Sequence, residues 1–341
     1  MNDLYSQLPG LLLPWYELHK RDLPWRKDRE PYHVWLSEIM LQQTRVEAVK
    51  GYYSRFLQAL PTIETLANAP AEQLNKLWEG LGYYSRVRNL QKAAKQVMEL
   101  HNGQFPTDHA AIHALAGIGD YTAGAIGSIC FELPTPAVDG NVPRVCSRLT
   151  ADASPIDKPQ TKKDLTTRLA EVYPAGRCGD FTQALMELGA TVCVPNGAPN
   201  CAVCPLSAIC LAHRDGLETE LPIKSAKKPR RVEEMTVFLL HDDDAYALRR
   251  RPDTGLLAGL WEFPHTEGKL ELEQVLEQLE QWEITPVEVE HSTEKTHIFT
   301  HVQWEMRGWS IRCRQSGADF FWQPPDTVAL PTAFRIFLKN V

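Results

Sequence analysis

The first two thirds of the chain carry apolar side chains at the spacing of amphipathic helices. In HVWLSEIMLQQTRVEAVKGYYSRFLQAL (33–60), apolar residues recur three and four positions apart. The segments 71–81, 89–101 and 162–173 repeat this pattern. The sequence therefore predicts an all-α domain over residues 1–224.

A basic, proline-bearing stretch, PIKSAKKPRR (222–231), follows this region and has no apolar periodicity. Residues 225–232 are predicted to form a linker, because such a composition does not build a packed element. A solvated tether is the favoured interpretation of its charges, and an arm that contacts phosphates is the alternative.

Beyond the linker, the pattern is that of strands with one helix. MTVFLL (235–240) and AYALRRR (245–251) lie on either side of an acidic turn, as the two strands of a hairpin do. LELEQVLEQLEQW (270–282) has helical spacing, and residues 296–309 alternate as strands do. The predicted second domain, at 233–341, is therefore a smaller α+β fold.

The composition is that of a two-domain globular protein, because the chain has 341 residues, of which 43% are hydrophobic and 23% are charged. The formal net charge of −7 provides no global basic field, so any binding of nucleic acid has to depend on local donors. No apolar run has membrane-spanning length, and LPGLLLPW near the start lacks a basic leader and a cleavage site. A reducing, cytoplasmic compartment is therefore expected.

Four cysteines lie within eighteen residues, in CVPNGAPNCAVCPLSAIC (193–210), at the spacing C-x7-C-x2-C-x5-C. Thiolates at this spacing can converge on one metal centre, and a reducing compartment disfavours disulfides. An iron–sulfur cluster is favoured over structural zinc, which commonly uses two C-x2-C pairs where this chain has one. The candidate ligands are Cys193, Cys201, Cys204 and Cys210.

The stretch LAGIGDYTAGAI (115–126) places Gly117 and Gly119 between two apolar helical segments. Such a hinge allows a tight turn, and the free N–H groups at the start of the second helix suit an anion such as a DNA phosphate. On the pattern alone, an ordinary helix–helix connection is the more frequent explanation.

Glu38 is the first of two candidate catalytic carboxylates. On a helix, its neighbours at i−4, i−3 and i+3 are Val34, Trp35 and Leu41, which places its carboxyl on an apolar face. Burial raises the pKa of a carboxyl, and a protonated carboxyl can protonate a leaving group. The alternative is a structural glutamate that pairs with an arginine or with a helix end.

The second candidate carboxylate is Asp139, in PAVDGNVPRV (136–145). From local spacing, Asp139 and Asn141 form a turn and cap the helix that starts near Val142. One neutral and one ionised carboxyl, however, are what the cleavage of a glycosidic bond through an oxocarbenium-like transition state requires.

Together with the hinge and the four cysteines, a set of longer motifs points to a known family. These motifs are VWLSEIMLQQT (34–44), GLGYYSR (80–86), VDGNV (138–142) and FTQALMELGATVC (181–193). The chain resembles the helix-hairpin-helix DNA glycosylases, and among them the adenine DNA glycosylase (MutY) family. The resemblance spans nearly the whole chain.

The resemblance implies a mechanism. Glu38 would protonate adenine at N7, Asp139 would stabilise or capture the oxocarbenium ion, and Glu38 would then activate water. Asn141 and Tyr121 would hold these groups in place. Tyr121 stands where the related endonuclease III type has a lysine that attacks the sugar, and a tyrosine cannot form a Schiff base. A monofunctional glycosylase is therefore expected.

The resemblance also implies contacts to the DNA. The residues matched to the extruded adenine are Trp25, Arg26 and Gln183. Those matched to the backbone and to the wedge at the vacated site are Gln43, Thr44, Leu81, Tyr83, Gly117 and Gly119.

The second domain resembles the Nudix fold, because AGLWEFP (258–264) is similar to the segment that precedes a Nudix box. The metal-binding pattern of that box is absent, so a lesion-reading role is expected instead of hydrolysis. The lesion loop is FTH, residues Phe299, Thr300 and His301, where the family has Phe-Ser-His. The glutamates that follow are expected on a solvated helix face, and they are Glu271, Glu273, Glu277 and Glu280.

The function implied is excision of adenine opposite 8-oxoguanine, and more weakly opposite guanine, from double-stranded DNA. A monomer with a [4Fe–4S] cluster at the bacterial nucleoid is expected, with a clamp or a mismatch-repair protein as possible partners. The spacing C-x7-C has one residue more than the family's usual six, and VPNGAPN is expected to absorb it. The alternatives are a non-catalytic lesion sensor, a bifunctional glycosylase/lyase and a nucleotide hydrolase.

Overall fold

The computed structural model describes residues 3–226, 229–316 and 319–338. Its backbone contacts divide the chain into two compact units, one formed by residues 1–69 and 88–226 and the other by residues 70–87 and 227–341. The predicted linker includes residues 227 and 228, which lie outside the described residues. The short helical segment before Tyr83 thus belongs, by its contacts, to the second unit.

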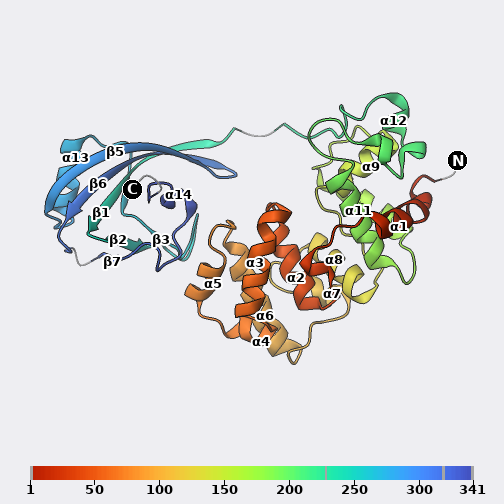
Figure 1. Cartoon of the computed structure of the whole chain (residues 1–341), viewed down its shortest axis with the longest axis horizontal. Helices are drawn as coiled ribbons and strands as arrows, with labels where there is room; N and C mark the ends of the chain where they lie inside the picture. The colour runs from red at the N-terminus through yellow and green to blue at the C-terminus, as the bar shows by residue number, and fades with distance from the viewer. Residues whose placement is uncertain (1–2, 227–228, 317–318, 339–341) are drawn as a thin grey trace. The chain divides into compact units, whose positions relative to one another are not determined.

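The first unit is built from helices, as the sequence predicts (Figure 1). The predicted helical stretch 33–60 divides into two helices at Gln42–Arg45, where Gln43 has a positive φ of 59°. Most of the unit's α-helices, in chain order, are α1 (Leu8–His19), α2 (Pro31–Leu41), α3 (Val46–Ala59), α4 (Ile63–Asn68), α6 (Ser85–Leu100), α7 (His109–His113), α8 (Asp120–Phe131), α9 (Val142–Thr150), α10 (Pro159–Ala170), α11 (Cys178–Thr191) and α12 (Leu211–Asp215). The short 3-10 turns are η1 (Tyr5–Gln7), η2 (Pro24–Arg26), η3 (Cys201–Val203) and η4 (Ser207–Ile209).

Helix α8 lies at the centre of the helical unit, between α2 and α11. Its small residues allow this close packing: a Cβ added at Gly124 would lie 2.1 Å from the carbonyl oxygen of Pro136. A second apolar cluster joins α1, α9 and α11 through side chains such as Leu12, Val145 and Leu188. These contacts fix α2, α9 and α11 relative to one another. The candidate carboxylates and many of the pocket residues lie in these helices or directly before them.

The predicted hinge is a helix–turn–helix formed by α7 and α8. Gly117 has a φ of 74°, and a Cβ there would lie 2.6 Å from Cβ of Asn89. Gly119 is the residue before α8, in extended conformation, and a Cβ there would meet no atom within 4 Å. Glycine is therefore required at position 117 by backbone conformation and by packing, whereas position 119 has room for a side chain.

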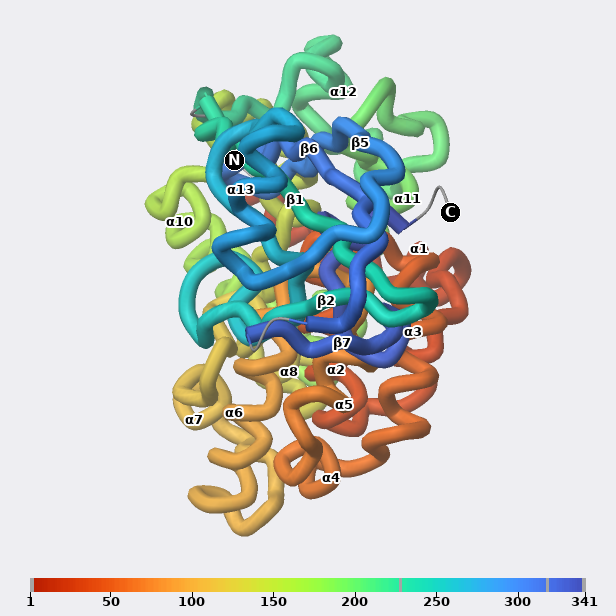
Figure 2. Tube along the Cα trace, turned by 90° about the vertical axis from the view of Figure 1, so that its left-hand side faces the viewer, coloured from red at the N-terminus to blue at the C-terminus, as the bar shows by residue number. Residues whose placement is uncertain are grey.

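The second unit contains a mixed seven-stranded sheet with central order β3-β2-β1-β6-β5. Figure 2 follows β1, β2, β5, β6 and β7 along the Cα trace. Strands β4 and β7 pair with β1 and β2, respectively. The strands are β1 (Arg231–Asp242), β2 (Ala245–Arg250), β3 (Trp261–Glu262), β4 (His265–Glu267), β5 (Pro286–Ile298), β6 (Val302–Cys313) and β7 (Phe321–Gln323). The helices of this unit are α5 (Ala71–Leu77), α13 (Leu272–Gln281) and α14 (Thr332–Arg335).

Residues 235–240 of the central strand β1 are buried on both faces of the sheet, because α14 lies on one side and α13 on the other (Figure 1). Val237 and Leu239 join the cluster that contains Phe334 of α14, whereas Phe238 and Leu240 join the cluster around α13. The continuous apolar run 235–240 thus reflects two buried faces.

The predicted fold class, an all-α domain followed by a smaller α+β domain, is confirmed. The predicted hairpin strands, the 270–282 helix and the strands around 296–309 are all present. No helix in the described part of the chain combines the length and the apolar character needed to cross a bilayer.

We predict that Gly117→Ala destabilises the helical unit. A side chain at this positive φ is strained and would also collide with Asn89, so we expect a loss of about 1–3 kcal/mol in the free energy of unfolding by urea. The matched control is Gly119→Ala, which adds a methyl to open space and should cost less than about 1 kcal/mol. Equal losses in the two variants would contradict this account of the hinge.

Candidate active site

A cleft of about 670 Å³ in the helical unit brings together all of the predicted catalytic and adenine-contacting residues. It is formed where α2, α8 and α11 meet the turn before α9. The predicted residues that line it are Trp25, Arg26, Glu38, Gln43, Thr44, Tyr121, Asp139, Asn141 and Gln183. The hinge glycines are not among its lining residues.

Glu38 lies in α2 with only 5% of its surface exposed, on the apolar face that helical spacing predicts. The hydroxyl of Tyr121, in the first turn of α8, donates a hydrogen bond to its Oε2. Burial raises the pKa of Glu38 to about 7, with a further increase from nearby Asp139, while Tyr121 and Arg26 oppose the rise. At neutral pH this carboxyl therefore exchanges readily between its protonated and ionised forms.

Asp139 ends the segment before α9, and its carboxylate is held by three N–H donors. Oδ1 accepts from the backbone N–H groups of Asn141 at 2.7 Å and Val142 at 2.9 Å, and Oδ2 accepts from the Asn141 amide at 2.6 Å. Burial raises the pKa of Asp139, but these donors and the Arg144 guanidinium oppose the rise by stabilising the charged form. Asp139 thus caps the helix, which was the structural alternative, and it also faces the cleft.

Arg144 connects this turn to the cysteine-rich segment. Its Nη2 donates to Oδ1 of Asn141 at 2.7 Å and to the carbonyl of Gly189 at 2.8 Å, and its Nε donates to the carbonyl of Cys193 at 2.8 Å. A Cβ at Gly189 would lie 2.5 Å from Cβ of Asn141, so the turn and α11 are in close contact. The orientation of Asn141, and through it of Asp139, therefore depends on both α9 and α11.

The residues predicted to contact adenine line the cleft from η2 and from α11. Trp25 is buried and packs edge-on against Tyr53, with ring centroids 5.5 Å apart. Gln183 lines the cleft from α11, and its amide lies 3.4 Å from the carbonyl of Gly179. Arg26 is held by a carboxylate that the sequence analysis did not single out, Glu187.

Glu187 is fully buried in α11 and lines the cleft between two arginines. Arg21 donates to both of its oxygens, at 2.7 Å and 3.0 Å, and Arg26 donates to Oε2 at 2.8 Å. Burial would raise the pKa of Glu187, but the two arginines outweigh burial and lower it. One signal was available: Glu187 is the single charged residue between Phe181 and Cys193.

The four candidate ligand cysteines line one cavity, with apolar side chains of α9 and α11 on its inner side. All eight cysteines of the chain are free thiols, so no disulfide competes for them. The Arg148 guanidinium lies 3.3 Å from Sγ of Cys193, and the Arg148 side chain is buried. Among the residues that the structure describes, no three of the four sulfur atoms lie within 4.8 Å of one another.

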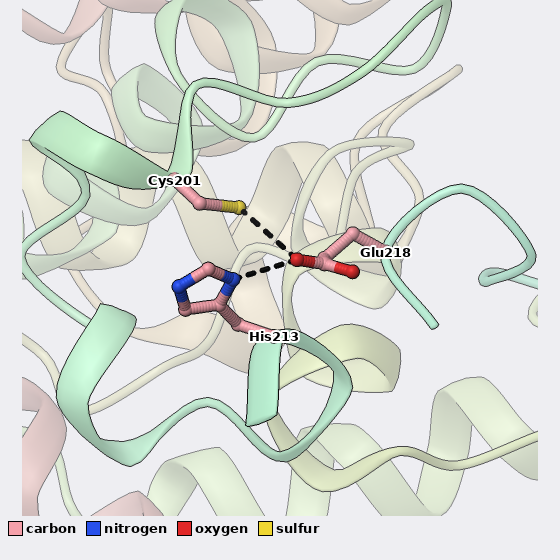
Figure 3. Close-up of side chains that lie close together, drawn as sticks. All are labelled: Cys201, His213 and Glu218. Carbon is pink, nitrogen blue, oxygen red and sulfur yellow. Dashed lines mark hydrogen bonds and ion pairs between the residues drawn. The ribbon is translucent and has the colours of Figure 1, made fainter. Parts of the chain in front are cut away.

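A different group of possible ligands lies at the edge of this cavity and shares Cys201 with it (Figure 3). Nδ1 of His213 is 2.6 Å from Oε1 of Glu218, and Sγ of Cys201 is 3.9 Å from the same oxygen. All three ligand atoms lie within 4.8 Å of one another. Because the two groups share Cys201, they compete for one thiolate.

In the second unit, the predicted lesion loop forms the turn between β5 and β6. Phe299 packs between His297 and Trp304, with ring centroids 4.6 Å and 4.7 Å away. The hydroxyl of Thr300 lies 2.8 Å from that of Tyr83, a residue that is 47% exposed.

Other predicted residues of this unit differ in their exposure. His301 of the lesion loop is exposed, whereas Leu81, predicted to contact DNA, is buried. The four glutamates of the α13 region are exposed, as predicted for a solvated face. Within the described residues, these glutamates form no group of three ligand atoms close enough to bind a metal ion.

Comparisons with known proteins show the family and the two domains. Residues 36–172 match the model of the HhH-GPD superfamily base excision DNA repair proteins, and residues 236–340 match that of the NUDIX domain. The chain is 36% identical to the adenine DNA glycosylase of Rattus norvegicus over 94% of this chain and 72% of the relative. The chain belongs to the adenine DNA glycosylase family. It is an enzyme of base excision repair, a hydrolase of N-glycosyl bonds.

Three further comparisons concern sequence and fold. This glycosylase is 36% identical to the Homo sapiens adenine DNA glycosylase over 86% of this chain and 65% of the relative. A thermostable thymine-DNA glycosylase superposes on 63% of this chain and 98% of its own, with a TM-score of 0.58 and 28% identity. Endonuclease III in a DNA complex superposes with a TM-score of 0.52 over 62% of this chain and 98% of its own, and at 22% identity it supports the helical fold alone.

We predict that Glu187→Gln destabilises the glycosylase by about 3 kcal/mol at pH 7, because two arginines lose the charge that compensates their partial burial. Urea unfolding measures the loss, and Glu47→Gln in the exposed pair with Lys50 is the control, expected within about 0.5 kcal/mol. The pairing lowers the pKa of Glu187 below its ordinary 4.5, so its stabilisation is present above that pH and should disappear as the pH falls through the lower value. A pH-independent difference would contradict the ion-pair explanation.

Proposed function

We propose that this glycosylase excises adenine opposite 8-oxoguanine, and more weakly opposite guanine, with Glu38 as general acid. The observation that supports this most is a buried carboxyl with a pKa raised to about 7 that faces the same cleft as Asp139. A carboxyl that titrates near neutrality can protonate the leaving base and, once ionised, activate water. Both tasks fall on one residue, and Tyr121 orients it through its hydroxyl.

Asp139 serves as the ionised partner in this proposal. Three N–H donors stabilise its charged form, so the carboxylate can remain negative beside an oxocarbenium-like sugar. Asn141 is a positioning residue, because its amide binds Asp139 while Arg144 fixes its other end.

Tyr121 supports a monofunctional reaction. Its hydroxyl is directed to Glu38, and its pKa is raised well above the ordinary value of 10.0 by burial and by the nearby carboxyls. A neutral phenol cannot form a Schiff base with the abasic sugar, so the strand should stay intact after the base has left.

Recognition of the partner base is assigned to the second unit. Tyr83 presents an exposed ring that can stack where a base has been displaced, and Thr300 binds its hydroxyl. The two groups come from the predicted wedge and the predicted lesion loop, so their contact supports a joint role in reading 8-oxoguanine. The threonine retains the hydroxyl of the family's serine.

A [4Fe–4S] cluster fits the four cysteines better than zinc does. Four thiolates bound to one zinc ion at about 2.3 Å stand roughly 3.8 Å from one another, whereas no three of these sulfur atoms lie within 4.8 Å of one another in the described residues. An iron–sulfur cluster separates its ligands further and accepts an enclosed, apolar cavity with a nearby cation. The cluster would brace the loop that Arg144 joins to Asn141.

The central test is single-turnover excision on duplexes with adenine opposite 8-oxoguanine, adenine opposite thymine and cytosine opposite 8-oxoguanine. We expect cleavage only of the adenine strand in the first duplex and only after alkali treatment. Glu38→Gln should lower the rate about 10²–10⁴-fold, because it removes the proton donor. Glu64→Gln, at an exposed glutamate of α4, should leave the rate unchanged.

The same assay across pH gives a second readout. The single-turnover rate of the wild type should fall as the pH rises through about 7, because the protonated form of Glu38 is then lost. Tight binding without excision would favour a lesion sensor, and nicking without alkali would favour a lyase. Full activity of Glu38→Gln would return Glu38 to a structural role.

Metal analysis tests the cofactor. We expect iron and acid-labile sulfide in the purified wild type, in a ratio of one to one, and loss of both in Cys204→Ala. Cys313→Ala, at a buried cysteine of β6, is the matched control and should keep the iron. Zinc in place of iron, or iron retained by Cys204→Ala, would contradict the assignment.

A further inference from the structure

The loop that presents Tyr83 is fixed at its base by residues near the C-terminus of the chain. Oε1 of Glu79 accepts a hydrogen bond from the backbone N–H of Leu330 at 3.1 Å and forms an ion pair with Arg335 of α14. Both side chains are largely covered, with 17% and 28% of their surfaces exposed. These residues belong to the same compact unit, although they are more than 250 positions apart.

Lys76 extends this contact by one helical turn. Its ammonium pairs with Oε2 of Glu79 at 2.8 Å and donates to the carbonyls of Asp326 at 2.7 Å and Val328 at 3.2 Å. Arg335 also pairs with Asp326 at 2.9 Å. The end of α5 therefore meets the 326–335 segment through charges of both signs and through backbone groups.

The loop itself has little regular structure to support it. Gly80, Gly82 and Tyr83 all have positive φ, at 95°, 70° and 48°. On the inner side, Trp78 donates to the carbonyl of Gly82 at 3.1 Å, and Arg86 donates to the same carbonyl at 3.0 Å. A non-glycine residue held in the left-handed region needs support from its surroundings.

We propose that the Glu79–Arg335 pair, reinforced by Lys76, is a positioning contact that holds the 79–83 loop for insertion into DNA. This inference rests on the proposed wedge role of Tyr83. A ring inserted into a base stack compensates part of the free-energy cost of unstacking the bases. The bases resist this insertion, so the loop that carries the ring has to be held in place. Thr300 supports the ring at its hydroxyl, and Glu79 supports the backbone four residues before it. Residues 326–335 thereby contribute to base extrusion through the loop.

The test measures extrusion separately from chemistry. A full-length enzyme is mixed with a duplex that carries 8-oxoguanine, a non-cleavable 2′-fluoro adenosine opposite it, and 2-aminopurine beside that adenosine. Fluorescence reports unstacking in Glu79→Ala, Arg335→Ala, the double variant and the conservative Glu79→Gln. Tyr83→Ala tests the wedge. The matched control is Glu288→Gln, at an exposed glutamate of β5 that pairs with Arg312.

We expect each single alanine variant to slow extrusion about five- to tenfold, and the double variant to be no slower than the worse single one, because the two residues act through one contact. The extrusion rate of Glu79→Gln should fall between those of wild type and Glu79→Ala, and that of Glu288→Gln should match wild type. Thermal unfolding should confirm that every variant is folded.

Wild-type extrusion in both single variants, with Tyr83→Ala impaired, overturns the positioning contact and leaves the wedge in place. Unimpaired Tyr83→Ala overturns the wedge and this inference with it. If the double variant slowed extrusion by the product of the two single-variant factors, the two residues would act independently, and this result would also overturn the positioning contact.

Discussion

The burial of carboxyl groups without loss of their hydrogen bonds is the constraint on which the site depends. Glu38, Asp139 and Glu187 lie in or beside one cleft, yet each is stabilised differently. Glu38 has a single phenol partner and a raised pKa, Asp139 has three N–H donors, and Glu187 has two arginines. The low dielectric of the packed helices magnifies these differences, so three like side chains acquire three protonation behaviours.

The fold and part of the site could be predicted because their signals are local. Helical periodicity alone places Glu38 on a buried face of α2, and strand alternation locates β1 and β6. The partners of Glu187 could not be predicted, because Arg21 and Arg26 are more than 160 residues away along the chain. A periodic pattern reports which face is buried, but it carries no information about which distant side chain arrives there.

The same limit applies to the second unit. Its sequence predicts strands and a helix, but the parallel pairing of β1 with β6 joins residues about 70 positions apart and leaves no local trace. The contacts of α5 could not be predicted for the same reason: its helical spacing resembles that of its neighbours, whereas its place in this unit depends on contacts with residues far away in the sequence, such as that of Lys76 with Asp326. The difference from the family's serine at Thr300 could be recognised in the sequence, because Thr300 lies within a short motif.

The separation between Glu79 and Arg335 has a consequence for synthesis. The cleft is complete once α11 has emerged from the ribosome, because its lining residues end at Ala190. The 79–83 loop, by contrast, meets its supports only when residues 326–335 have been translated, and contacts of such long range form slowly. A nascent chain that ends before residue 326 would therefore contain every residue of the catalytic pocket but would lack the anchor of the loop.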